Sequence, residues 1–321
     1  MEEAIRAGLM NLRGLIVAVV ILAGLGGVLY WSQNRKPPEE TAATPANATP
    51  VILKVNAADV TQIAIKQKQS DPVTLQKADA NKWQITEPKP YRADQETVAS
   101  MLSTLSGLSA DRVVEDKASD RKQYGLDPAA VELDITGKSQ GTRQLLLGDD
   151  TPAGGDAYAA LAGDPRVFTV SSYNKTSLAK GLNELRDKSL LTVNPDKVSH
   201  VALVRKGQEI EFGRTKDGWQ ILKPRSSPAD STAVNDLVRS LTSATMQLSA
   251  SGTSDPAVEF ARATPVATAK LTGDTGVQTL EVRKNKDDYY AKSSTVDGVF
   301  KVDSSLGTAL DKKMDDFQKK K

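Results

Sequence analysis

The sequence predicts an α+β protein: an N-terminal transmembrane helix followed by two tandem diverged repeats of antiparallel sheet plus helices. Three observations carry this prediction. Near the N-terminus lies a long uncharged apolar run. Beyond it, short segments alternate apolar and polar residues, as half-buried strands do. The motif KWQITEP at Lys82–Pro88 also returns as GWQILKP at Gly218–Pro224, 136 residues later, which indicates an internal duplication.

The apolar run reads GLIVAVVILAGLGGVLYW from Gly14 to Trp31, and no charged residue lies between Arg13 and Arg35. As a helix, these ~21 residues extend ~32 Å, enough for a hydrocarbon core of ~30 Å. Two aromatic residues end the run, as is common at a membrane surface. We therefore predict a transmembrane helix over residues 14–32. A cleaved signal peptide is the alternative, although its apolar core is usually shorter.

The predicted organisation follows from this segment. Residues 1–13 are expected to be a cytoplasmic tail, because a short tail before one span is the usual layout of a signal anchor. Residues 33–50 contain Pro, Ala, Thr and Glu but no large apolar side chain, which predicts a flexible linker. Residues 51–192 form repeat 1 and residues 193–321 form repeat 2, each an α+β unit.

The duplication extends through the whole unit. The same offset of 136 relates apolar positions at helical spacing, namely Val98, Met101, Leu102 and Leu105, to Val234, Leu237, Val238 and Leu241. Further on, Val167–Val170 matches Val299–Val302 at an offset of 132. The drop of four residues predicts that one loop of repeat 1 is longer. The repeated Trp83 and Trp219 each alternate with a core isoleucine, which predicts that they anchor the cores.

Each repeat is expected to begin with an antiparallel meander and a helix. In repeat 1 the alternation predicts three strands, at Val60–Lys66, Pro72–Lys77 and Lys82–Thr86. Turns are expected at Asp71-Pro72 and Asp79–Asn81. Asp94 is a suitable N-cap for the helix that follows, which buries one face.

Two hairpins and a closing helix complete the expected unit. The hairpins span Val131–Leu147 and Ala157–Val170, each around a glycine-containing turn. Ser171 or Ser172 caps one helix that carries Leu178, Leu182 and Leu185. In repeat 2 the corresponding cap is Asp303 or Ser304.

The composition excludes several classes of function. The 42 basic and 40 acidic residues leave a net charge of +2, so no nucleic acid partner is expected. The chain has no cysteine, which excludes disulfides and thiolate metal sites. Its single histidine, His200, makes a histidine zinc site or a serine triad hard to assemble, and the strand phase predicts that it faces solvent. No catalytic residue, cofactor or metal is predicted.

Ser172 and Lys175 satisfy the Ser-x-x-Lys pattern of penicillin-recognising enzymes, in which the lysine activates the serine. The same spacing recurs at Ser119–Lys122 and Ser177–Lys180, as expected by chance in a chain rich in both residues. The predicted helix cap also explains Ser172 without catalysis. An enzyme is therefore the third hypothesis only.

A glycine-rich acidic loop distinguishes repeat 1, because nothing around Lys284–Lys286 corresponds to it in repeat 2. Such a loop is where a partner or ligand contact is expected first, with an ordinary hairpin connection as the alternative. The candidate contact residues lie in this loop and in the strand after it: Gly148, Asp149, Asp150, Gly154, Gly155 and Tyr158.

Several motifs together resemble a bacterial family called domain of unknown function 4340. They are the repeated Trp-x-Ile motif, Tyr124–Pro128, Leu147-Gly148 through Tyr158 to Val170, and Asp187–Leu191. The resemblance covers roughly residues 60–300 and transfers no site residues. It implies a single-pass protein of the bacterial inner (plasma) membrane with the bulk of the chain extracytoplasmic. It also implies ABC transporter permeases or auxiliary subunits as partners.

The leading hypothesis is a non-enzymatic, membrane-anchored extracytoplasmic interaction module that is accessory to an ABC-type transporter. The alternative is an envelope-ligand binder, of glycan or peptidoglycan, that uses a cleft between the two repeats. An uncharacterised periplasmic enzyme is the third hypothesis.

Overall fold

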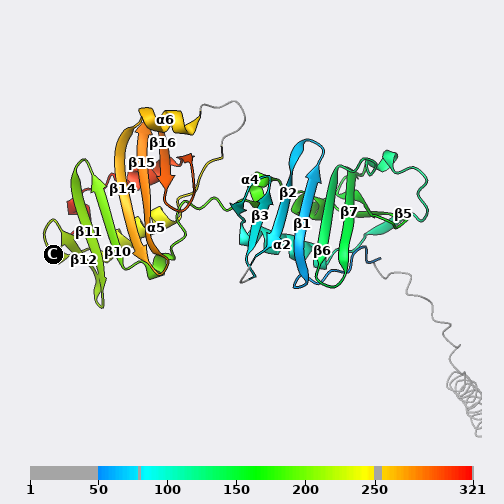
Figure 1. The fold of residues 1–321 in the computed structure, drawn as a ribbon, viewed down its shortest axis with the longest axis horizontal. Helices are drawn as coiled ribbons and strands as arrows, with labels where there is room; N and C mark the ends of the chain where they lie inside the picture. Colours follow the sequence, from blue (N-terminus) through cyan, green and yellow to red (C-terminus); the bar gives the residue numbers. More distant parts are fainter. Residues whose placement is uncertain (1–49, 79–80, 249–254, 320–321) are drawn as a thin grey trace, which may run out of the picture. The chain divides into compact units, whose positions relative to one another are not determined.

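The computed structural model describes residues 50–78, 81–248 and 255–319 (Figure 1). The predicted cytoplasmic tail, transmembrane helix and all but the last residue of the linker lie outside these residues. Within the described residues, no helix has the length and apolar character needed to cross a membrane.

Repeat 1 contains a nine-stranded antiparallel sheet in the order β4-β3-β2-β1-β6-β7-β8-β9-β5. The predicted meander forms its first half and the two predicted hairpins form most of the second. The strands are β1 (Val60–Gln67), β2 (Ser70–Lys77), β3 (Trp83–Glu87), β4 (Tyr91–Arg92), β5 (Arg112–Glu115), β6 (Val131–Gly137), β7 (Gly141–Asp150), β8 (Asp156–Leu161) and β9 (Val167–Ser171).

Helices cover one face of this sheet and enclose the core. They are α2 (Gln95–Ser106), α3 (Ser172–Leu178) and α4 (Leu182–Leu185). Asp94 caps α2 as predicted, because its side chain accepts a hydrogen bond from Thr97 N. The core joins the inward residues of the strands, such as Ile63 and Leu133, to the buried leucines of the helices.

Repeat 2 contains an eight-stranded antiparallel sheet in the order β13-β12-β11-β10-β14-β15-β16-β17. The strands are β10 (His200–Arg205), β11 (Gln208–Thr215), β12 (Gly218–Lys223), β13 (Ser227–Pro228), β14 (Thr264–Gly273), β15 (Gly276–Asn285), β16 (Asp288–Ser293) and β17 (Val299–Val302). Its helical segments are η3 (Pro195–Lys197), α5 (Ser231–Thr242), α6 (Pro256–Arg262), α7 (Ser304–Leu310) and η4 (Met314–Phe317).

The eight strands of the second sheet follow the same order as the first eight of the first sheet, and β5 alone has no strand counterpart, so the prediction of two similar α+β units is confirmed. The match extends to single bridges. Gln247 pairs with Lys301 of β17, where β5 pairs with β9 in repeat 1. Ala229 likewise pairs with Gln318, as Ala93 pairs with Arg186. Trp83 and Trp219 are both buried in their cores, as predicted.

A short helical segment also lies on the other face of each sheet, opposite the helices that cover the main core. Because neighbouring strand residues alternate in direction, Leu146 points away from the core that contains Leu145 and Leu147. Leu146 packs instead with Leu126, which follows η2 (Lys122–Tyr124). In repeat 2, α6 takes this place and packs over β15, β16 and β17.

Three predictions were wrong in detail. The closing helix of repeat 1 is two short helices, α3 and α4, because the chain leaves the helical conformation at Ala179 and Gly181. The first turn lies at Lys68-Gln69, and Asp71-Pro72 belongs to β2. The extra residues of repeat 1 lie in two loops: one residue between β6 and β7, and three between β7 and β8.

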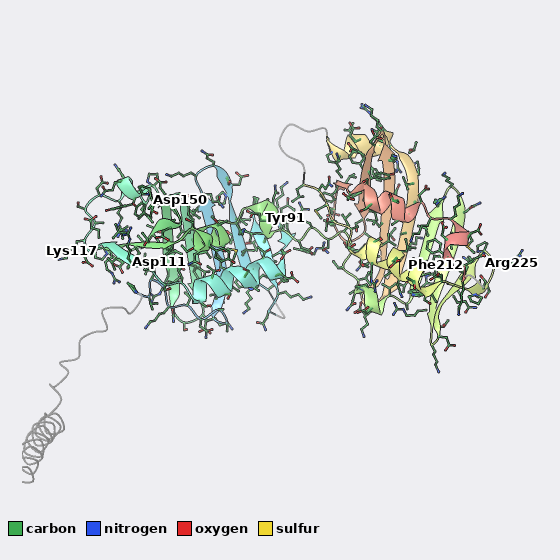
Figure 2. The ribbon with its side chains drawn as sticks, turned by 180° about the vertical axis from the view of Figure 1, so that it is seen from behind. Tyr91, Asp111, Lys117, Asp150, Phe212 and Arg225 are labelled. Atoms are coloured by element: carbon green, nitrogen blue, oxygen red, sulfur yellow. The ribbon has the colours of Figure 1, made fainter. Side chains whose placement is uncertain are left out.

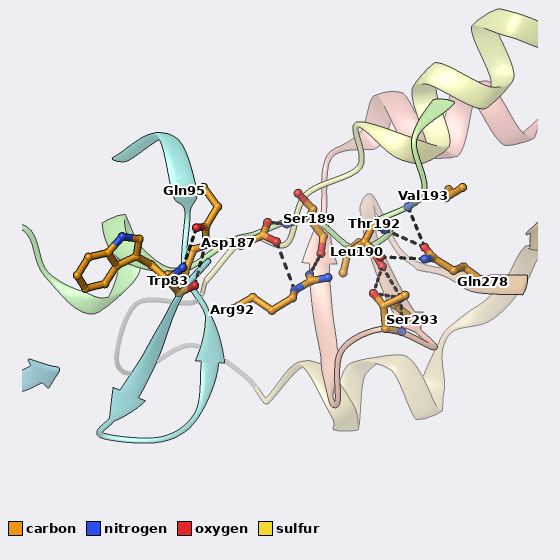
Figure 3. Close-up of polar contacts among 12 residues, drawn as sticks. Trp83, Arg92, Gln95, Asp187, Ser189, Leu190, Thr192, Val193, Gln278 and Ser293 are labelled. Carbon is orange, nitrogen blue, oxygen red and sulfur yellow. Dashed lines mark hydrogen bonds and ion pairs between the residues drawn. The ribbon is translucent and has the colours of Figure 1, made fainter. Parts of the chain in front are cut away.

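The segment that connects the two sheets is bonded to elements on both sides (Figure 3). Arg92 Nε lies 3.3 Å from Asp187 Oδ2, and Arg92 also donates to the carbonyl of Ser189. The carbonyl of Leu190 accepts hydrogen bonds from the hydroxyls of Ser293 and Thr295. The residues that connect the two sheets are therefore hydrogen-bonded to residues of both repeats.

Candidate interaction site

The predicted acidic loop is the tight connection between β7 and β8. Thr151 N donates to Asp156 O over 2.9 Å, and Gly154 N donates to Thr151 O over 2.9 Å. Gly154 and Gly155 have φ values of 74° and 83°, a region that side chains other than glycine rarely adopt. The two glycines thus allow the chain to reverse direction within five residues, and the hydrogen bonds hold the turn in one conformation.

This turn is fastened to the start of α3. Ser171 caps the helix by accepting a hydrogen bond from Tyr173 N, as predicted, and Ser172 N donates to Gly155 O over 2.9 Å. Lys175 Nζ lies 2.8 Å from Asp150 Oδ1; Asp150 is labelled in Figure 2. The Asp150 side chain remains 66% exposed, so its second oxygen is accessible to a partner.

Tyr173 stands beside this turn with its ring in solvent. It is 73% exposed, the highest value among the exposed large hydrophobic side chains of the described residues. These are Val51, Tyr173, Val204, Leu222, Val258 and Val277. A large exposed aromatic side chain next to a rigid turn is a common feature of protein interfaces.

Gly148 and Asp149 lie against the segment Tyr124–Leu126. A Cβ atom on Gly148 would come within 2.1 Å of the Tyr124 carbonyl oxygen. A Cβ atom on Gly125 would come within 2.4 Å of the Asp149 carboxyl carbon. Both glycines are therefore needed for the close approach of the two segments. Gly148 acts as a packing residue, whereas the Asp149 residue remains exposed.

Tyr158 packs with Tyr124 on the face of the sheet opposite the main core. Their ring centroids are 4.9 Å apart with an interplanar angle of 59°. The Tyr124 hydroxyl donates to Glu115 Oε2 over 3.0 Å. That hydrogen bond, assisted by burial, raises the pKa of the Tyr124 phenol above its ordinary value. The phenol therefore stays neutral and keeps donating near neutral pH.

The six predicted residues thus divide into two groups. Asp149, Asp150, Gly154 and Gly155 are exposed, whereas Gly148 is buried and Tyr158 is half-buried in packing. Tyr173 was not predicted as a site residue. Its position in the first turn of a capped helix, outside the stripe of Leu178, Leu182 and Leu185, was the signal that pointed to its exposure.

The residues that were considered for catalysis in the sequence, but not predicted to be catalytic, have structural partners. Lys175, the lysine of the Ser-x-x-Lys pattern, is ion-paired with Asp150. His200 lies on the face opposite the core, with Nε2 3.7 Å from Glu211 Oε2. Over residues 50–78, 81–248 and 255–319, no group of three acidic or histidine side chains is arranged to hold a metal ion.

Fold and site together define a tandem-repeat α+β protein that presents a rigid, acidic, aromatic-flanked turn. Comparison with known families then gives its membership. The model of the family described as "Domain of unknown function (DUF4340)" matches residues 83–260 and again residues 219–321. The chain therefore belongs to this family. The two matches begin at Trp83 and Trp219, the positions that the duplication relates.

No curated protein and no solved structure matches the chain.

Proposed function

We propose that this protein is a membrane-anchored, extracytoplasmic interaction module without catalytic activity, and that its partner is the permease or an auxiliary subunit of an ABC-type transporter. The apolar run Gly14–Trp31 supports the anchor, and the motifs shared with the family support the transporter. One observation carries the interaction itself: Tyr173 is 73% exposed beside a turn held by hydrogen bonds.

The turn and its surroundings have the properties of a binding surface. Because the turn is already ordered, little conformational entropy is lost when a partner docks on it. Tyrosine offers a large contact area at low entropic cost and is frequent among the residues that dominate binding energy. The exposed Asp149 and Asp150 lie beside the Pro152–Gly155 turn, which favours a partner with basic side chains around an apolar notch.

The test replaces Tyr173 by serine, the residue that repeat 2 carries at the equivalent position, Ser305. Both residues donate their backbone N–H to the helix cap, so the substitution keeps the local structure. Affinity purification of the full-length Tyr173→Ser chain in mild detergent should recover about ten-fold less transporter subunit than the wild type, as expected for a contact worth ~1.4 kcal/mol.

Val277→Ser is the matched control, since Val277 is 62% exposed but lies on β15 of repeat 2. The control should recover the partner as the wild type does. If neither the wild type nor the control recovers a permease or auxiliary subunit, the transporter part of the proposal is wrong. If Tyr173→Ser recovers as much partner as Val277→Ser, the turn is not the binding surface.

The membrane anchor has its own test. The full-length chain should sediment with membranes and resist extraction by carbonate, because an apolar helix of this length stays in the bilayer. Protease added outside sealed spheroplasts should degrade the residues after 50. A chain that stays in the soluble fraction would contradict the anchor.

A further inference from the structure

A polar cavity lies at the end of α7 in repeat 2, far along the sequence from the site described above. Its volume is about 530 Å³, within the usual range of small-molecule sites. The wall consists of the turn after β10, the start of β14, the end of β15, the start of β16, and α7 with the residues that follow it. The basic side chains in this wall are Lys206, Lys284 and Lys312.

None of these three lysines is ion-paired with an acidic side chain of the described residues. Lys284 is half-buried, and its Nζ lies 5.1 Å from the centroid of the Tyr289 ring. An aromatic face stabilises an ammonium group only modestly, so this half-buried charge still favours a counter-ion. The cavity therefore contains positive charge that the protein leaves uncompensated.

The two acidic residues of the wall are engaged elsewhere. Asp311 Oδ1 lies 3.3 Å from Arg205 Nη1, and Arg205 also donates to Lys312 O over 2.9 Å. Asp316 Oδ2 accepts a hydrogen bond from Lys313 N over 2.7 Å. The Arg205 guanidinium compensates the charge of Asp311, whereas Asp316 keeps its charge. The three lysines still leave the wall with an excess of positive charge.

The aromatic wall of the cavity depends on a glycine in α7. A Cβ atom on Gly307 would come within 2.0 Å of the Tyr289 ring, so the ring lies directly against the helix backbone. The equivalent positions of repeat 1 carry Lys175 for Gly307 and Asp149 for Lys284. There, Lys175 is neutralised by Asp150. Repeat 2 thus has an open basic cluster where repeat 1 has a lysine neutralised by an aspartate.

We propose that this cavity binds a phosphate ester group, held by Lys206, Lys284 and Lys312 and flanked by the ring of Tyr289. Lysine ammonium groups bind phosphate as point charges and tolerate varied geometry. The volume exceeds that of a lone phosphate, which leaves room for the organic part of a phosphorylated small molecule or a lipid headgroup. This site is independent of the turn at Tyr173.

The experiment titrates the full-length chain in neutral detergent by isothermal calorimetry. The probes are inorganic phosphate, glycerol phosphate, short-chain phosphatidylglycerol and, as a zwitterionic reference, short-chain phosphatidylcholine. Lys284→Asp introduces the residue that repeat 1 carries at this position and should weaken phosphate ester binding at least ten-fold. Lys270→Asp makes the same charge change on an exposed β14 position and should leave the affinity within two-fold.

Lys312→Gln serves as the second variant if Lys284→Asp does not fold, and it should weaken binding by a smaller factor. Preference for glycerol phosphate supports the site with a free ligand, and preference for phosphatidylglycerol over phosphatidylcholine supports it with a lipid headgroup. The proposal is overturned if neither phosphate ester binds. It is also overturned if Lys284→Asp and Lys270→Asp weaken binding equally, because binding then reflects net charge alone.

Discussion

In both repeats a short segment covers the open face of the sheet at the same end, but the contacts that hold this segment differ. In repeat 1, Gly148 removes a side chain so that Tyr124–Leu126 can lie directly on β7. The equivalent residue of repeat 2 is Arg283, whose guanidinium carbon lies 4.4 Å from the centroid of the Phe260 ring on α6. In repeat 1 the covering segment fits against the sheet because Gly148 has no side chain. In repeat 2 the covering helix packs through a cation–π contact.

This difference shows where the copies were free to diverge. The cores kept their apolar positions, because inward strand residues and helix stripes must still fit each other. The end that contains the β7–β8 and β15–β16 connections changed its length, its charge and its covering segment. Both proposed sites lie at this end of their repeats. Divergence there is compatible with each copy having acquired a separate partner.

The largest expected effect is that of Gly148→Ala. The added methyl would stand 2.1 Å from the backbone oxygen of Tyr124, so β7 or the covering segment must move. Overpacking of this kind costs about 2–3 kcal/mol of unfolding free energy. Urea unfolding measures the loss, and hydrogen exchange should assign it to repeat 1. Gly137→Ala is the control, because its nearest neighbour would be 3.7 Å away; equal stability of the two variants would contradict the close-approach argument.

A smaller effect is expected from Arg283→Ala, which removes the contact to Phe260 and the ion pair with Glu281 at 2.7 Å. The side chain is partly buried, and a cation–π contact of this kind contributes about 1 kcal/mol. Amide hydrogens of α6 should exchange about five-fold faster. Arg239→Ala, which changes a side chain that is 75% exposed, should leave α6 unchanged. Unaltered exchange in Arg283→Ala would show that α6 is held by other contacts.

The smallest expected effect on stability comes from an ion pair on the open face of the repeat 2 sheet. Glu211 of β11 lies 2.6 Å from Lys223 of β12, where repeat 1 has a hydrogen bond between Thr74 and Glu87. The hydrogen bond from Lys223 lowers the pKa of Glu211 below its ordinary value of 4.5. The folded state therefore favours the carboxylate, and this stabilisation is present above pH ~4.5 and lost as the pH falls through the lowered pKa.

Wild type and Glu211→Gln should accordingly differ in unfolding free energy at pH 7 and converge at an acid pH below the lowered pKa of Glu211. Because the Lys223 side chain is 53% exposed, high salt should shrink the gap at pH 7. A gap of the same size at both pH values would mean that the ion pair does not cause it.

Local patterns were sufficient to predict most elements. Alternation around Ile63 and Ile65 identified β1, and the caps at Asp94, Ser171 and Asp303 were correct because capping depends on adjacent residues. The strand β5 was missed, since its pairing with β9 joins residues far apart in sequence. The helix α6 was missed as well, because a seven-residue helix with one buried residue, Phe260, carries little periodicity.

The candidate site was predicted as a loop but not as a surface. The glycines and aspartates predicted the turn, because glycine-rich connections have a recognisable composition. The contacts that define its shape are non-local. Gly148 meets Tyr124, and Asp150 meets Lys175, only after the sheet and α3 have formed. The basic cavity of repeat 2 is lined by lysines from three separate parts of the chain. Their spacing in the sequence does not predict that they lie together.

The connecting segment has a practical consequence for dissecting the protein. Asp187 N donates to Arg92 O, and the next residue, Lys188, accepts at its carbonyl from Met246 N. Arg92 of the first sheet also donates to the carbonyl of Ser189, so the bonds to the two sheet units overlap along the chain. A cut in this stretch removes hydrogen-bonded residues from one unit or the other, so two separately expressed halves keep all of these bonds only if both contain these residues.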